Sequence, residues 1–301
     1  IAERYESLDD SQDDTEASLE QLLDEADEAR KQFEELKEQL LENPEADFHE
    51  ERLLEQLQQK QDALEESVNK VAEKMEELAQ QMQENDLVSE DTMNMFEELQ
   101  EVVEEVRTPE LMDALKQLQS AMQNMDMNEM QDALEKFEFS EEMYQERLER
   151  TLDLFKKFRV DQDMEEIEER AKDLSETEQR LADETEKLEE EQKQAEDPQD
   201  ANSDNEQPGE RKDELAEEQE LAAEEMKALG EKMEEVRKRM EEMDNMPAEE
   251  MQDLMEDTQD QEMSQKMKDN AQKMRENELQ EAGQEQQKMS EQLDQLSSQM
   301  D

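Results

Sequence analysis

The chain has 301 residues, and its 97 acidic residues against 33 basic ones give it a formal net charge of −64. Only 32% of the residues are hydrophobic and 43% are charged, which excludes the wide core of an ordinary globular domain. Nucleic acid is excluded as a partner, because phosphate binding requires basic patches. Repulsion between the negative chain and anionic lipid disfavours direct contact with a membrane surface. The chain has no cysteine, so disulfides, thiol catalysis and thiolate metal sites are excluded as well.

The remaining composition predicts an all-α protein. Glu, Gln, Leu, Met, Ala and Lys dominate, and these residues lose little side-chain freedom in a helix. No stretch shows the alternation of apolar and polar residues that is typical of a half-buried strand. A disordered chain would share the charge, but here the few apolar residues recur at a helical period. We therefore expect extended antiparallel coiled-coil hairpins with a small central helical bundle.

Residues 1–18 are acidic, and we expect them to be frayed. Over 19–84, apolar residues recur at alternating steps of three and four, the period at which helices bury a narrow seam against a partner. Asn43 and Pro44 predict that one helix ends near Glu42 and that a second one follows. The two helices share this period and a short connection, so 19–84 is predicted to be an antiparallel coiled-coil hairpin. The seam positions are Leu19, Leu22, Ala26, Ala29, Phe33, Leu36, Leu40, Leu54, Leu57, Gln61, Leu64, Val68, Val71, Met75, Leu78 and Met82.

Residues 85–160 are interpreted as a bundle of short helices. A helix over about 90–107 is followed by helix starts at Pro109, Asp126 and Ser140, each with the residues of an N-terminal cap or first turn. Aromatic side chains bury the most area per residue, and we expect those of this segment to form the tightest core. They are Phe137, Phe139, Tyr144, Phe155 and Phe158.

The seam returns over 161–195, which we predict to be a coiled-coil helix. Residues 196–210 hold two prolines and a glycine, and they predict a flexible linker and the best domain boundary of the chain. Residues 211–301 form a Met- and Gln-rich helical region in which Pro247 starts a short helix and Asn277 caps the last one. Some seam positions are polar, and they can specify either register or the number of partners. Examples are Gln61, Glu178 and Gln286. The sequence leaves open whether the seams close within one chain or between chains.

The chain has 23 methionines, and they are most crowded after residue 220. Methionine is flexible and polarizable, so a pliable groove for partners is one interpretation. The other is that methionine fills the core at seam positions, and this is favoured because Met226, Met233, Met240 and Met243 all lie on a seam.

No catalytic, cofactor or metal residue is predicted, and we expect the protein not to be an enzyme. The carboxylates are expected on solvated helix faces, where the split pKa values of an acid–base pair do not arise. The single histidine, His49, has no cysteine with which to build a zinc site.

The linker does not match the ligand pattern of a calcium-binding loop. Asp200, Asn202 and Asp204 match the first ligand positions, but Asn205 stands where glycine is required and Arg211 where a bidentate glutamate belongs. We therefore expect only weak, diffuse binding of divalent cations to the acidic surface.

The middle and the end of the chain resemble a known family. The matching segments are TPELMDALKQLQSAMQNMDMNEMQDALEKFEFSEEMYQERLERTLDLFKKF (108–158), RAKDLSETEQRLADET (170–185) and NELQEAGQEQQKMSEQLDQLSSQM (277–300). They resemble the bacterial proteins catalogued as domain of unknown function four-one-seven-five, which are common in the Bacteroidetes. The resemblance covers about 85–301 and is best over 108–185 and 277–300. It implies a large envelope protein with transmembrane helices near its N-terminus and a long helical soluble region, and it implies no activity and no catalytic residues.

These observations together predict a structural or interaction module of a bacterial envelope protein that binds a protein partner or itself through heptad seams. The chain begins with Ile1 and holds no apolar run of the ~20 residues that span a bilayer, so we interpret it as a segment of a longer protein without membrane contact of its own. The alternatives are a holdase-like module that binds clients through methionine-rich faces, and a partly disordered acidic segment that buffers cations or folds on binding. The charge also suggests a saline environment, because salt screens self-repulsion.

Overall fold

The computed structural model describes residues 2–42, 48–85, 88–106, 110–124, 127–195, 208–243, 246–258 and 260–300. All regular secondary structure within these ranges is α-helical, so the predicted all-α class is confirmed. The helices are α1 (Ala2–Glu42), α2 (Phe48–Asn85), α3 (Glu90–Val106), α4 (Glu110–Asn124), α5 (Met127–Ala195), α6 (Pro208–Glu241), α7 (Ala248–Thr258), α8 (Asp260–Arg275) and α9 (Leu279–Met300).

The chain divides into two compact units, which we call the N-terminal unit (residues 2–159) and the C-terminal unit (residues 160–301). The boundary falls inside α5, so the predicted boundary at 196–210 was wrong. That segment connects α5 to α6, and the two helices pack on each other within one unit: Arg211 lies 2.9 Å from Glu191, and Arg180 lies 2.6 Å from Glu218. Proline and glycine mark where a helix stops, but they do not show where side-chain packing stops.

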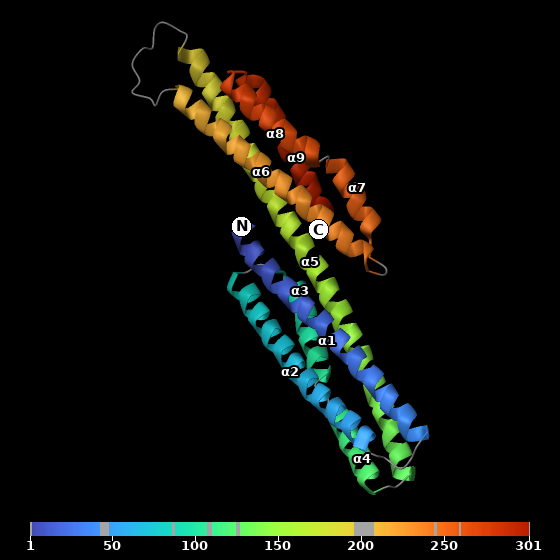
Figure 1. Ribbon diagram of the computed structural model, residues 1–301. Coiled ribbons are helices and arrows are strands. Elements are labelled where there is room, and N and C mark those ends of the chain that lie inside the picture. Colours follow the sequence, from blue (N-terminus) through green and yellow to red (C-terminus); the bar gives the residue numbers. More distant parts are fainter. Residues whose placement is uncertain are drawn as a thin grey trace. The chain divides into compact units, whose positions relative to one another are not determined.

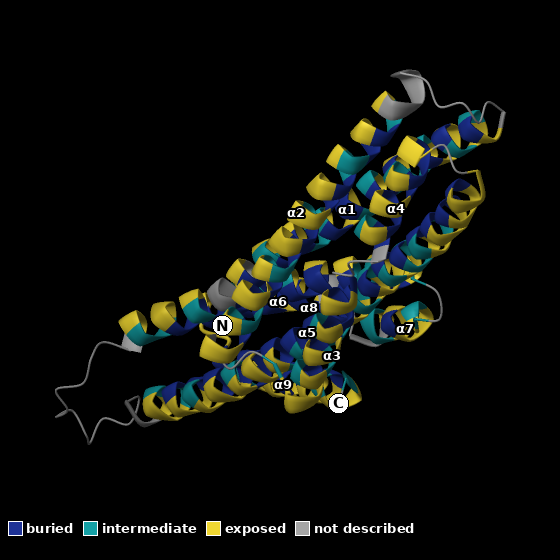
Figure 2. Cartoon of the chain, turned by 90° about the horizontal axis from the view of Figure 1, so that it is seen from below, coloured by how far each residue is buried: buried dark blue, intermediate teal, exposed yellow. Residues whose placement is uncertain are grey.

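In the N-terminal unit, α1 and α2 form the predicted antiparallel hairpin (Figure 1). Lys60 pairs with Glu28 at 2.8 Å, whereas Lys74, further along α2, donates to the backbone oxygen of Asp14, earlier in α1. The predicted seam residues of both helices are buried, as the dark stripes in Figure 2 illustrate. The helices α3, α4 and the first half of α5 join the same hydrophobic core, so 19–84 and 85–160 belong to one unit.

The expected fraying of residues 1–18 was wrong. The helix α1 begins at Ala2, and Tyr5 and Leu8 are buried. Gln12 and Thr15 are also buried, and they continue the steps of three and four from Leu8 to Leu19. The seam therefore extends to the start of α1, but two of its positions carry polar residues, so the apolar period is interrupted there.

The helix starts expected at Ser140 and at residue 161 were also wrong, because α5 is one continuous helix of 69 residues. A residue that can cap a helix does so only where the preceding backbone is not helical. Residues 127–195 contain neither glycine nor proline, so nothing interrupts the helix before Ser140.

Four of the five aromatic residues of this region are buried as predicted. The rings of Phe33 and Phe137 are 4.1 Å apart between centroids, and those of Phe96 and Phe158 are 4.9 Å apart. Phe139 is the exception, because 64% of it is exposed. It follows buried Phe137 by two residues, and residues two apart on a helix point to different sides.

In the C-terminal unit, the second half of α5 packs with α6, α8 and α9, while α7 contacts α6, α8 and α9 (Figure 1). The predicted seam residues of α6, α8 and α9 lie in this core, and Met243 and Met300 are partly buried at its edge.

Asn277 does not cap α9 as expected. Its φ is 71°, and it ends α8 in the left-handed conformation, with Asn277 N–H donating to the Met274 oxygen and Glu278 N–H to the Lys273 oxygen. This pair of bonds is the Schellman motif, in which Asn is accepted in place of glycine. The backbone oxygen of Glu278 accepts the bond from Ala282 that opens α9.

Candidate functional site

Two groups of polar side chains, all buried except the partly buried Arg239, lie in the C-terminal unit. The first, here called the ionic cluster, consists of Asp163, Glu166, Arg170, Lys232 and Arg239. The second, here called the polar layer, consists of Glu178, Gln219 and Gln286. Both connect helices that are far apart in the sequence.

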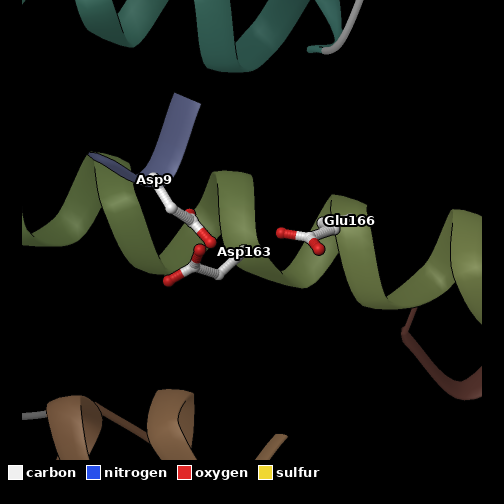
Figure 3. A group of neighbouring side chains, drawn as sticks. All are labelled: Asp9, Asp163 and Glu166. Atoms are coloured by element: carbon white, nitrogen blue, oxygen red, sulfur yellow. The ribbon is translucent and has the colours of Figure 1, made fainter. Parts of the chain in front are cut away.

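The carboxylates of the ionic cluster come from successive turns of α5, as Figure 3 shows. Asp163 is 0% exposed and Glu166 is 2% exposed. The ammonium group of Lys232, on α6, lies 2.8 Å from Asp163 Oδ1 and 3.3 Å from Glu166 Oε2. An ionised group at such depth is tolerated only when it is paired, and one lysine here serves two carboxylates.

Each carboxylate also contacts an arginine. Arg170 donates from Nη1 to Glu166 Oε1 at 2.9 Å and from Nε to Glu225 at 2.9 Å. Arg239 pairs with Asp163 and donates to Glu235 at 3.0 Å. Arginine suits these positions because its planar fork binds two acceptors at once. The cluster therefore joins α5 to α6 in one register, and cations of this chain neutralise both of its buried carboxylates.

The polar layer spans the core of the same unit. The side-chain amide of Gln219 on α6 donates to Glu178 Oε1 on α5, and Gln286 on α9 donates to Gln219 Oε1 at 2.7 Å. The Gln286 amide nitrogen also lies 3.9 Å from the sulfur of Met274 on α8. Glu178, Gln219 and Gln286 are all 0% exposed, so this layer connects four helices without solvent.

Glu178 differs from the carboxylates of the ionic cluster in its protonation. Burial raises the pKa of its carboxyl group to about 8, and the hydrogen bond from Gln219 lowers it only partly. Glu178 is therefore a neutral acid at neutral pH, because no cation compensates the desolvation of its charged form. Its second oxygen, Oε2, has no hydrogen-bond partner among the described residues, and neither has Gln286 Oε1.

Smaller polar contacts tie the remaining helix pairs of this unit together. The hydroxyl of Ser175 donates to the backbone oxygen of Ser290 at 3.0 Å, which joins α5 to α9. The hydroxyl of Ser264 donates to the backbone oxygen of Ala223 at 2.8 Å, which joins α8 to α6. These bonds set how the helices face one another and supply no reactive group.

The expectation that all carboxylates lie on solvated faces was wrong for Asp163, Glu166, Glu178 and Glu141. Burial also raises the pKa of Glu141, on α5 in the N-terminal unit, to about 7, although Arg30 lowers it from a distance of 3.8 Å. The sequence did contain a signal for Glu178, since it occupies a seam position. It contained none for Asp163 and Glu166, which lie beside the predicted seam.

The remaining residues singled out in the sequence are His49, the calcium-like loop and the methionines on the seams. The side chain of His49 and residues 196–207 lie outside the described residues, and with them the first ligand positions of the calcium-like loop. Arg211, which occupies the last position of that loop, pairs with Glu191 at 2.9 Å. Met226, Met233 and Met240 are buried in the core, as the interpretation of methionine as filler predicted.

Comparisons with protein-family models, with curated proteins and with solved structures found no match for this chain. The resemblance to the domain of unknown function family therefore stays a prediction. Among the described residues, no helix combines the length and the apolar character that crossing a bilayer requires.

Proposed function

We propose that this chain is a non-enzymatic structural and interaction module that meets basic protein partners through its acidic exterior. The observation that carries the proposal is that the apolar seams are buried within each unit of a single chain. A seam that is already occupied offers no surface to a second chain. The part of the molecule left for recognition is its exterior, and most of the charge of −64 lies there.

The chemistry of the two buried polar groups supports a structural role. In the ionic cluster, Asp163 and Glu166 are each held by two cations, so neither is available to move a proton to or from a substrate. In the polar layer, Glu178 has an unusual pKa, but it is sealed in the core at 0% exposure. Buried polar groups of this kind are known to specify helix register in bundles.

The proposed setting is the soluble region of a bacterial envelope protein, and the support for it is the resemblance of residues 108–185 and 277–300. An exterior of this charge keeps a long helical segment soluble and repels anionic lipid and nucleic acid. Long-range attraction then accelerates the encounter with basic proteins.

The test is the absolute mass by light scattering on a sizing column, at low salt and at ~1 M salt, where the Debye length falls to about 3 Å. We expect a monomer of 35.7 kDa under both conditions, because the seams close internally. A mass that doubles at high salt would contradict the proposal, since it would mean that the chain associates with itself once repulsion is screened.

A further inference from the structure

Phe139 is the one exposed aromatic side chain among the described residues. It lies on α5 in the N-terminal unit, and its exposed fraction is 64%, whereas the other described aromatic residues are buried. Single exposed apolar residues are common on proteins and need no explanation. Phe139 is different because it lines a groove and does not stand on a convex surface.

The groove runs between α4 and α5, which lie side by side in Figure 1. Lys136 on α5 donates to Gln117 Oε1 on α4 at 3.0 Å, so the two helices are bridged one turn away from Phe139. Ala114 on α4 also lines the groove and is buried. Phe139 lines the same groove with 64% of its surface exposed, so its ring is accessible from solvent there.

The rim of this groove is negative. Asp113 on α4 and Asp132 and Glu135 on α5 line it and are exposed, against the single ammonium group of Lys136. Asp113 has Lys116 of its own helix at 3.8 Å, and Glu135 accepts a bond from Gln131 at 3.3 Å. Exposed pairs of this kind are weak, so a cationic side chain of a partner can replace them at both carboxylates.

We propose that this groove is a docking site for a basic segment of another protein in which an arginine stacks on the Phe139 ring. An aromatic face attracts a cation, and arginine stacks more readily than lysine because its guanidinium group is planar and weakly hydrated. Further basic residues of the same segment pair with Asp132 and Glu135 on the rim. The inference rests on the proposed function, since it assigns one place on the acidic exterior to the basic partner.

The experiment measures fluorescence anisotropy of two labelled helical peptides titrated with the full chain at physiological salt. One peptide is built from Ala, Leu and Arg, and the other has Lys at every Arg position, so that length and charge are equal. We expect the arginine peptide to bind more tightly. Phe139→Ala should weaken its binding about tenfold, and Phe139→Trp should preserve or strengthen it.

Two matched controls separate this groove from the rest of the surface. Leu221→Ala removes an apolar side chain that is equally exposed, at 64%, and it should leave binding unchanged. Asp132→Asn with Glu135→Gln should weaken binding, whereas Glu249→Gln with Glu250→Gln, on α7, changes the net charge equally and should have a much smaller effect.

The outcomes distinguish the groove from the proposed function. If the arginine peptide binds but Phe139→Ala behaves like Leu221→Ala, the groove is not the site, and the acidic exterior remains the binding surface. If the two peptides bind equally, the stacking of arginine is wrong. If neither peptide binds the unmodified chain, both this inference and the proposed function are overturned.

Discussion

The side-chain amide of Gln219 on α6 donates a hydrogen bond to the buried carboxyl group of Glu178 on α5. This bond does not replace the hydration that an ionised carboxylate would lose, so the pKa of Glu178 rises to about 8. The C-terminal unit therefore contains a neutral acid in the middle of its core. The unit loses stability as the pH rises from the ordinary pKa of a glutamate towards the raised pKa of Glu178.

The first prediction concerns pH. The folded pKa of Glu178, about 8, lies above its ordinary value of 4.5, so its contribution to stability is complete below pH 4.5 and is lost as pH rises towards 8. Glu178→Gln keeps the bond from Gln219 and cannot ionise. The variant should gain on the order of 4 kcal/mol relative to the unmodified chain between pH 4 and pH 9.

The measurement is hydrogen exchange of the backbone amides over residues 160–301 across this pH range, corrected for intrinsic exchange rates. The relevant quantity is the difference between variant and unmodified chain, because every other acidic residue titrates equally in both. A difference that stays constant from pH 4 to pH 9 would show that Glu178 is solvated.

The second prediction concerns Glu166 in the ionic cluster, where replacing Glu by Gln should destabilise the protein, whereas at Glu178 it should stabilise it. Glu166→Gln removes a charge that Lys232 and Arg170 both contact, and it leaves these cations buried with too few partners. We expect a loss of about 3 kcal/mol at pH 7, since breaking one partner of a buried ion pair leaves an uncompensated charge. Urea unfolding of this variant beside Glu178→Gln provides the comparison, and the same sign for both would refute the assignment of charges.

The third prediction concerns the aromatic core. Phe155 is fully buried, and its ring centroid lies 6.0 Å from that of Phe158. Phe155→Ala should cost about 3–5 kcal/mol, because it removes apolar contacts and leaves a cavity. Phe139→Ala should change stability by less than about 0.5 kcal/mol, because that side chain is exposed. Thermal melting of the two variants tests both, and similar melting temperatures would contradict the assignment of the core.

The fourth prediction is a strong effect of salt. A formal charge of −64 repels itself in any compact state, and salt screens this repulsion. Helicity by circular dichroism and the melting temperature should both rise between ~0.01 M and ~1 M salt. Independence from salt would remove the support for a saline environment.

Some of the buried polar sites were visible in the sequence and others were not. Glu178 and Gln286 occupy positions where the steps of three and four demand a buried residue, so their burial follows from the period alone. Asp163 and Glu166 occupy no such position. They are buried because α6 places Lys232 and Arg239 against that side of α5, and a pairing across 66 or more residues has no local signature.

The sequence by itself determined the all-α class and the buried face of the seam helices, because the period of 3.5 is a property of neighbouring residues on one helix. It also determined the acidic exterior. Only the tertiary structure decided that 196–210 joins helices of one unit and that α5 belongs to both units. The physical reason is that an apolar seam must pack against another helix, but the seam alone does not determine which helix that is. The partner is chosen by the fit and charge of residues distant in the chain, such as Lys232 for Asp163 and Gln219 for Glu178.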